Sequence, residues 1–297
     1  HIGFISGGDE KGAESFVAAM RDGLRTVGYS EPETIALDRL YADYEMDKVP
    51  SLVAELQNRG VDLIVTHAAA TPIIVQDKER STPVVYEFSA DPIAIGIATD
   101  LAHPLFNATG ITLMKAELNS KRLEFLHELV PAVGRVAVIA NPLHAGEANE
   151  RADLAASAQK LGIKLEFFKT PNRPELDRAL AAIRANPPDA IVAFSEGFVV
   201  ENRDLIIGLA NGLKLPLVSG WAIMAKSGAL FTYGPRLVES YRRTAYFIDR
   251  ILKGAKPEEL PIERPTVFEL VLNLKTAKTL GLAIPQTLLA HADEVIE

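Results

Sequence analysis

The feature of this sequence that most constrains its fold is the alternation, from end to end, of short apolar runs with longer amphipathic stretches. Most of the runs are rich in Val and Ile without polar alternation, which is typical of parallel strands buried on both faces of a sheet. Strands that alternate with helices predict a doubly wound α/β fold. Strands are expected at residues 2–5, 34–37, 61–66, 83–86, 110–113, 136–139, 164–168, 190–194, 215–218 and 229–233.

Apolar residues at helical spacing predict the helices between these strands. One stripe consists of Phe16, Met20, Leu24 and Val27, and another of Leu237, Tyr241, Ala245, Ile248 and Leu252. Ten strands are more than one open sheet of this type usually contains. Two similar lobes are therefore expected. A strand ends and a long helix begins near residues 113–115, which predicts a boundary between lobes there.

Composition and charge exclude several classes of function. The net charge of −8 disfavours a nucleic-acid partner, because such binding depends on patches of Lys and Arg. The absence of cysteine removes disulfides, thiolate metal sites and cysteine nucleophiles. No apolar stretch is long enough to cross a bilayer. Because the sequence starts at His1 inside a predicted strand, we expect that an upstream segment such as a signal peptide was removed.

The glycine turn after the first strand does not have the sequence of a nucleotide site. Gly7 and Gly12 have the spacing of the two glycines of a P-loop, but Ala13 and Glu14 stand where Lys and Ser or Thr are needed. The stretch also lacks G-x-G-x-x-G. Two interpretations remain open, a tight strand-to-helix turn and a contact with a small solute.

Signatures of catalysis are weak. The six histidines show no metal-binding spacing, and no G-x-S-x-G motif is present. A Ser–His–Asp triad could still assemble in space, because sequence order does not reveal it. We expect no metal, no cofactor and no catalytic residue.

The loops that follow the predicted strands contain the candidate binding residues. Parallel sheets bind ligands at the carboxyl ends of their strands, and these loops mix small, hydroxyl, acidic and aromatic residues. Helix N-terminal N–H groups suit a carboxylate, Asp91 or Glu196 an amine, and Phe88, Phe198 and Trp221 an apolar body. Packing between sheet and helix is the alternative for each aromatic residue. The candidates are Ser6, Gly7, Gly8, His67, Ala69, Ala70, Thr71, Phe88, Ser89, Asp91, Asn141, His144, Ser195, Glu196, Phe198, Ser219 and Trp221, with Ala145 in the same loop as His144.

Several blocks of the sequence carry a family resemblance. The segment "ALFTYGPRLVESYRRTAYFIDRILKGAKPEELPIERPTVFELVLNLKTAKTLGLAIPQTLLAHADEVIE" closely resembles the end of ABC-transporter substrate-binding proteins of the family with tryptophan- and tyrosine-binding members. "IGFISGG", "PVVYEFSADPIAIG", "NATGIT" and "ELNSKRLEFLHELVPAVGRVAVIANP" fit the same family. The resemblance covers nearly the whole chain.

The resemblance implies a type I periplasmic-binding-protein fold, in which two Rossmann-like lobes with parallel sheets are joined by three hinge crossovers. Lobe 1 would comprise residues 1–113 and 234–262, and lobe 2 residues 114–233 and 263–297. The implied function is that of a periplasmic or extracytoplasmic receptor that clamps a small solute, an amino acid or related carboxylate, and delivers it to an ABC permease. It would be associated with the membrane through its transporter or a removed N-terminal segment, and a monomer is expected because clamping requires free lobe motion.

Two other classes of function remain open. An enzyme such as a racemase or hydrolase could act between two α/β lobes, although the missing cysteines exclude a cysteine-pair racemase. The sensor module of a ligand-responsive regulator is the other, although no helix-turn-helix precedes the first strand.

Overall fold

The computed structural model describes residues 1–77, 80–113, 117–144 and 146–297. The chain divides into two compact units, unit 1 (His1–Met114 and Leu237–Pro265) and unit 2 (Lys115–Arg236 and Thr266–Glu297). The chain therefore passes from one unit to the other three times. Within the described ranges, no helix is both long and apolar enough to cross a membrane.

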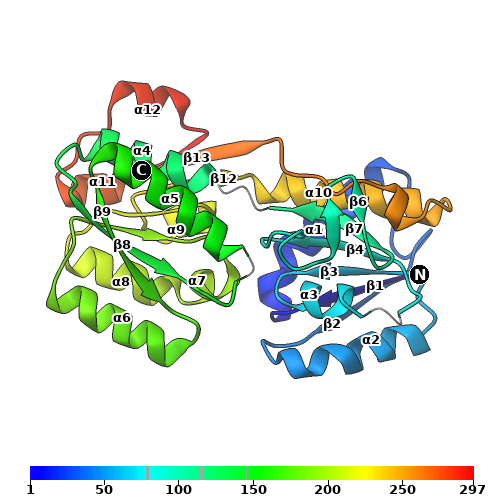
Figure 1. Ribbon diagram of the computed structural model, residues 1–297. Helices are drawn as coiled ribbons and strands as arrows, with labels where there is room; N and C mark the ends of the chain where they lie inside the picture. Colours follow the sequence, from blue (N-terminus) through cyan, green and yellow to red (C-terminus); the bar gives the residue numbers. More distant parts are fainter. Residues whose placement is uncertain (78–79, 114–116, 145) are drawn as a thin grey trace. The chain divides into compact units, whose positions relative to one another are not determined.

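Unit 1 is built on a five-stranded parallel sheet with the strand order β2-β1-β3-β4-β7. Helices α1 and α10 pack side by side on one face, and α2 lies over the other (Figure 1). A short antiparallel ribbon, β5 with β6, is separate from the sheet. The elements are β1 (Ile2–Ser6), α1 (Glu10–Thr26), β2 (Leu37–Tyr41), α2 (Val49–Asn58), β3 (Leu63–His67), α3 (Ala70–Val75), β4 (Val84–Phe88), β5 (Ala98–Asp100), β6 (His103–Pro104), β7 (Ala108–Thr112) and α10 (Leu237–Leu252).

The predicted stripe of α1 packs as expected except at its end. Phe16, Met20 and Leu24 are buried, whereas Val27 lies at the C-cap beyond the last turn and is 38% exposed. At Gly23, a Cβ atom would lie 2.3 Å from the carbonyl oxygen of Arg242 on α10, so the missing side chain lets the two helices approach closely.

The second predicted strand, at residues 34–37, is wrong. The backbone N–H groups of Thr34 and Ile35 both donate to the carbonyl oxygen of Ser30, which closes a turn there, and the strand begins only at Leu37. Its sequence, LDRLY, carries two charged side chains because β2 is an edge strand and is partly exposed.

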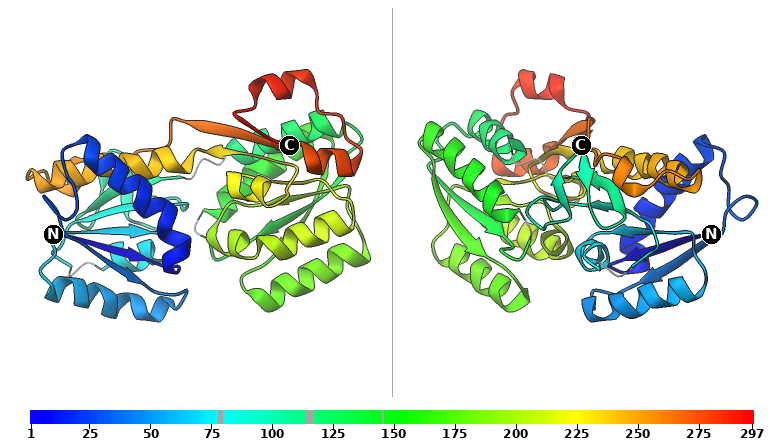
Figure 2. Two further views of the ribbon diagram at one scale, coloured as in Figure 1. Left: turned by 180° about the vertical axis from the view of Figure 1, so that it is seen from behind. Right: turned by 45° about the vertical axis from the view of Figure 1, so that its right-hand side comes forward.

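Unit 2 contains a seven-stranded sheet with the order β14-β13-β12-β11-β10-β8-β9. Helices α4, α5, α11 and α12 contribute to the core on one face, and α6, α8 and α9 to the core on the other (Figure 2). The elements are α4 (Glu117–Leu129), β8 (Arg135–Ala140), α5 (Glu147–Leu161), β9 (Lys164–Lys169), α6 (Arg173–Ala185), β10 (Ala190–Ala193), α7 (Gly197–Glu201), α8 (Arg203–Gly212), β11 (Leu217–Ser219), α9 (Ala222–Lys226), β12 (Phe231–Pro235), β13 (Phe268–Asn273), α11 (Leu274–Leu280), α12 (Gln286–His291) and β14 (Glu294–Ile296).

This sheet is mainly, but not wholly, parallel. Strand β13, which the sequence analysis does not predict, pairs antiparallel with β12 and parallel with β14. The expectation of an α/β fold with parallel sheets is therefore confirmed, with one antiparallel pairing in unit 2. The physical reason is the route of the chain, because β13 enters unit 2 directly from the proline-containing segment that ends unit 1 rather than through a crossover helix.

Candidate functional site

The turn between β1 and α1 brings several predicted residues of unit 1 together. Ser6 Oγ accepts a hydrogen bond from the N–H of Gly8 at 3.1 Å, and the N–H of Gly7 donates to the carbonyl oxygen of His67 at 3.3 Å. A Cβ atom on Gly7 would lie 2.8 Å from the backbone nitrogen of Ala70. The turn therefore packs directly against the start of α3, which leaves no room for a side chain at position 7.

The loop after β2 adds an aromatic residue that the sequence analysis missed. Asp43 and Tyr44 both adopt left-handed backbone conformations, with φ of 49° and 65°, and their N–H groups donate to the carbonyl oxygens of Gly8 and Gly7. Such conformations are strained for residues other than glycine and occur often at functional sites. Tyr44 is 50% exposed, and its ring lies beside Gly8.

His67 is held by a buried carboxylate. Its Nδ1 lies 2.7 Å from Oε2 of Glu87, a residue with no exposed surface, and its ring packs against Phe16 and Tyr241. Oε1 of Glu87 is buried and has no hydrogen-bond partner within the described part of the chain. The pair fixes the orientation of the imidazole at the carboxyl end of β3.

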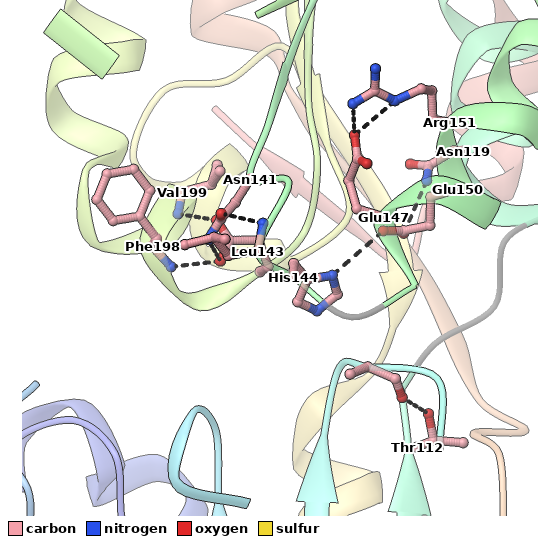
Figure 3. A network of polar contacts seen from close by, with 12 residues as sticks. Thr112, Asn119, Asn141, Leu143, His144, Glu147, Glu150, Arg151, Phe198 and Val199 are labelled. Atoms are coloured by element: carbon pink, nitrogen blue, oxygen red, sulfur yellow. Dashed lines mark hydrogen bonds and ion pairs between the residues drawn. The ribbon is translucent and has the colours of Figure 1, made fainter. Parts of the chain in front are cut away.

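The loop after β4 is shaped by its own hydrogen bonds. Phe88 is only 3% exposed and packs edge-to-face on Tyr86, so it belongs to the core of unit 1. The Thr112 hydroxyl donates to the carbonyl oxygen of Ala90 at 2.7 Å (Figure 3). Oδ1 of Asp91 accepts hydrogen bonds from the N–H groups of Ile93 and Ala94, so this oxygen of the carboxylate stabilises the turn. Ser89 lies in the same loop.

Two further predicted residues begin α3. Ala69 is its N-cap and Ala70 its first residue, while Thr71 is buried with its hydroxyl 3.5 Å from that of Thr66. Thr71 is therefore a packing residue.

In unit 2, Glu196 caps α7. Its two carboxylate oxygens accept the N–H groups of Phe198 and Val199 at 3.0 and 2.8 Å, and Asn141 Nδ2 lies 3.5 Å from Oε2 (Figure 3). Burial raises the pKa of Glu196, and the hydrogen bonds from Phe198, Val199 and Asn141 oppose that rise.

The remaining predicted residues of unit 2 follow β8, β10 and β11. Ser219 is fully buried and its hydroxyl donates to the carbonyl oxygen of Ala193, so it supports the sheet. Phe198 and Trp221 are half-buried, and Trp221 is the N-cap of α9. His144 lies in the loop after β8, whereas Ala145 is outside the described residues.

Arg122 is a buried charged residue that the sequence analysis did not single out. It is only 3% exposed; its Nε donates to the carbonyl oxygen of Tyr233 at 2.7 Å, and Nη1 donates to Oδ1 of Asn119. Burial lowers the pKa of its guanidinium to about 10. A signal exists in the sequence, because Arg122 lies four residues from both Leu118 and Leu126, on the buried stripe of α4.

Asn119 links Arg122 to a second buried charge. Its Nδ2 donates to Glu150 at 3.0 Å, and His144 Nδ1 lies 3.9 Å from the same carboxylate (Figure 3). Burial raises the pKa of Glu150 to about 7, against the opposing effect of Arg122. Glu150 is therefore about half protonated at neutral pH.

The acidic and histidine side chains do not gather into a metal site. Within the described ranges, no group of three or more His, Asp and Glu residues has a geometry that could hold a metal ion.

Comparison with known proteins identifies the family. The family model described as "ABC transporter substrate binding protein" matches residues 5–296. This chain belongs to that family of substrate-binding proteins. The family is generally non-enzymatic. Comparison with curated protein sequences finds no match.

Solved structures of other proteins share the fold. The ABC domain in complex with L-Trp from Streptococcus pneumonia superposes with a TM-score of 0.91 at 23% identity, covering 99% of each chain. A conserved domain protein from Vibrio cholerae gives 0.89 at 24% identity, covering 99% of this chain and 98% of the other. The ligand-free, open structure of CD0873, an adhesive substrate-binding protein from Clostridium difficile, gives 0.76 at 19% identity over 99% and 98%. The architecture is that of type I periplasmic binding proteins.

Proposed function

We propose that this protein is an extracytoplasmic receptor of an ABC importer that clamps a small organic carboxylate, an amino acid or a close relative, between its two units. Family membership supports the transport role. The carboxyl edges of the two sheets carry the polar groups that such a ligand needs, and the chain passes between the units three times. A ligand that contacts both units stabilises only the arrangement in which both sets of contacts form.

Exposed apolar side chains support the clamping role. Tyr44, Ile73 and Ile93 in unit 1, and Leu143 and Ile223 in unit 2, all follow the carboxyl ends of strands and are between 37% and 76% exposed. Such exposed apolar surface is common at ligand sites and at surfaces that become covered. We infer that ligand binding and closure bury these residues.

The candidate residues suit different parts of such a ligand. In unit 1, the partly exposed Asp91 and the imidazole of His67 are suited to a ligand ammonium group. Glu196 is less suited, because both of its oxygens already cap α7. The half-buried rings of Phe198 and Trp221 and the exposed ring of Tyr44 are suited to an apolar or aromatic ligand body.

Calorimetry against the amino acids and aromatic acids tests this proposal. We expect micromolar or tighter binding of at least one member, because a receptor must capture its solute at low concentration. Small-angle scattering of the same sample should show compaction on saturation, since closure brings the units together. Failure of every member of the panel to bind would reject the proposed ligand class, and binding without compaction would reject clamping.

A further inference from the structure

We infer that Arg122 and Ser195 form the anion site of unit 2 that receives the carboxylate of the ligand. This inference rests on the proposed function and specifies the chemistry by which one unit would recognise the solute.

The first observation is that hydrogen bonds to the described residues hold two nitrogens of the Arg122 guanidinium but not the third. Nε and Nη1 are fixed by the Tyr233 carbonyl and by Asn119, and no hydrogen bond of Nη2 is found within the described part of the chain. Both fixed partners are neutral, so neither of them supplies a counter-charge. A buried cation without a counter-charge is costly, which favours a site that binds an anion.

The second observation is a hydroxyl that converges on the same point. Ser195 Oγ is buried and has no hydrogen-bond partner within the described ranges. Both Nη2 of Arg122 and Oγ of Ser195 lie 2.1 Å from the position that a Cβ atom would occupy on Gly220. The two donors are therefore within about 4.2 Å of each other, a spacing that a single carboxylate can bridge.

The third observation is that Glu150 is a poor internal counter-charge. Its hydrogen-bond link to Arg122 passes through Asn119, and its pKa is raised to about 7 by burial, which weakens its charge near neutral pH. A ligand carboxylate would supply a full negative charge beside Arg122 and accept charge-assisted hydrogen bonds from its guanidinium.

Arg80 in unit 1 shows what a structural buried arginine looks like in the same protein. It is 5% exposed, and burial lowers its pKa to about 10, as for Arg122. Its Nε, Nη1 and Nη2, however, each donate to a backbone carbonyl oxygen, of Ile74, Thr82 and Phe106. No nitrogen of Arg80 is left for a ligand, so it provides a matched control.

The test compares acids with their amides. L-Tryptophan, L-phenylalanine and L-leucine, and the amide of each, are titrated calorimetrically into the wild type, Arg122→Gln and Arg80→Lys. We expect Arg122→Gln to weaken binding of the acids by at least about 30-fold and of the amides by less than threefold. Arg80→Lys should leave both within twofold.

Two milder variants keep the test decisive if Arg122→Gln does not fold. Ser195→Ala should weaken binding of the acids about fivefold and spare the amides, and Arg122→Lys should weaken the acids at least tenfold because it loses the planar fork. Near-ultraviolet circular dichroism of each variant checks the fold.

The outcomes separate this inference from the proposed function. If the acids bind the wild type no more tightly than the amides, or if the Arg122 and Ser195 variants bind acids as well as the wild type does, the anion site is refuted while the receptor function stands. If no amino acid or aromatic acid of the full panel binds the wild type, the proposed ligand class and this inference both fail.

Discussion

Replacing Glu150 by glutamine removes a buried carboxylate whose protonation changes near neutral pH. Burial raises its pKa from 4.5 to about 7, so the native state retains a proton that the unfolded chain releases. The resulting stabilisation is fully present below pH 4.5 and is lost as the pH rises through 7. At about 1.4 kcal/mol per unit of pKa, the full effect is about 3 kcal/mol.

The measurable part of this effect lies between pH 5.5 and pH 8. Over that range we expect the free energy of unfolding of unit 2 to fall by about 2 kcal/mol in the wild type from this group alone, and the Glu150→Gln variant to lack that fall. At an m-value of about 2 kcal/mol per molar, the two urea midpoints should separate by about 1 M across the range.

Fluorescence of Trp221 follows this transition, because it is the sole tryptophan of the chain and belongs to unit 2. Glu166→Gln, at an exposed carboxylate on β9 in the same unit, controls for the removal of a charge. Parallel pH profiles for the wild type and Glu150→Gln would show that Glu150 is not titrating in this range, and the reasoning from burial would be wrong.

Two further predictions concern the anion site of unit 2. Affinity for an acid such as L-tryptophan should fall about three- to tenfold between pH 6 and pH 8, because ionised Glu150 competes for Arg122; the same carboxylate also faces His144, Glu147 and Glu196. Calorimetry should show this fall in the wild type but not in Glu150→Gln, and a flat wild-type profile would contradict the coupling. Gly220→Ala should weaken binding of the acid at least tenfold, because the new methyl group would occupy the point where Arg122 and Ser195 converge. Urea unfolding should show a loss of about 1 to 3 kcal/mol in unit 2, and full affinity with a native fold would argue against this geometry.

The sequence by itself determined the fold class and most of the strands. Buried parallel strands require apolar side chains on both faces, so runs such as those at Ile2–Ser6 and Arg135–Ala140 are recognisable without any tertiary information. Edge strands escape this rule because they are half exposed. For that reason LDRLY at Leu37–Tyr41 was misplaced. The strand FELVLN at Phe268–Asn273, which lies inside the sheet between β12 and β14, was not predicted either.

Only the tertiary structure decided which polar residues of the loops and helices are buried and what they contact. Lys121 and Arg122 are neighbours of similar chemistry in one helix, yet the first is exposed and the second is enclosed by Asn119, Tyr233 and Gly220. Likewise, Phe88 proved to be a core residue, and Tyr44 an exposed one. Hydrogen-bond partners come from segments far apart in the chain, and local patterns of hydrophobicity do not identify those partners.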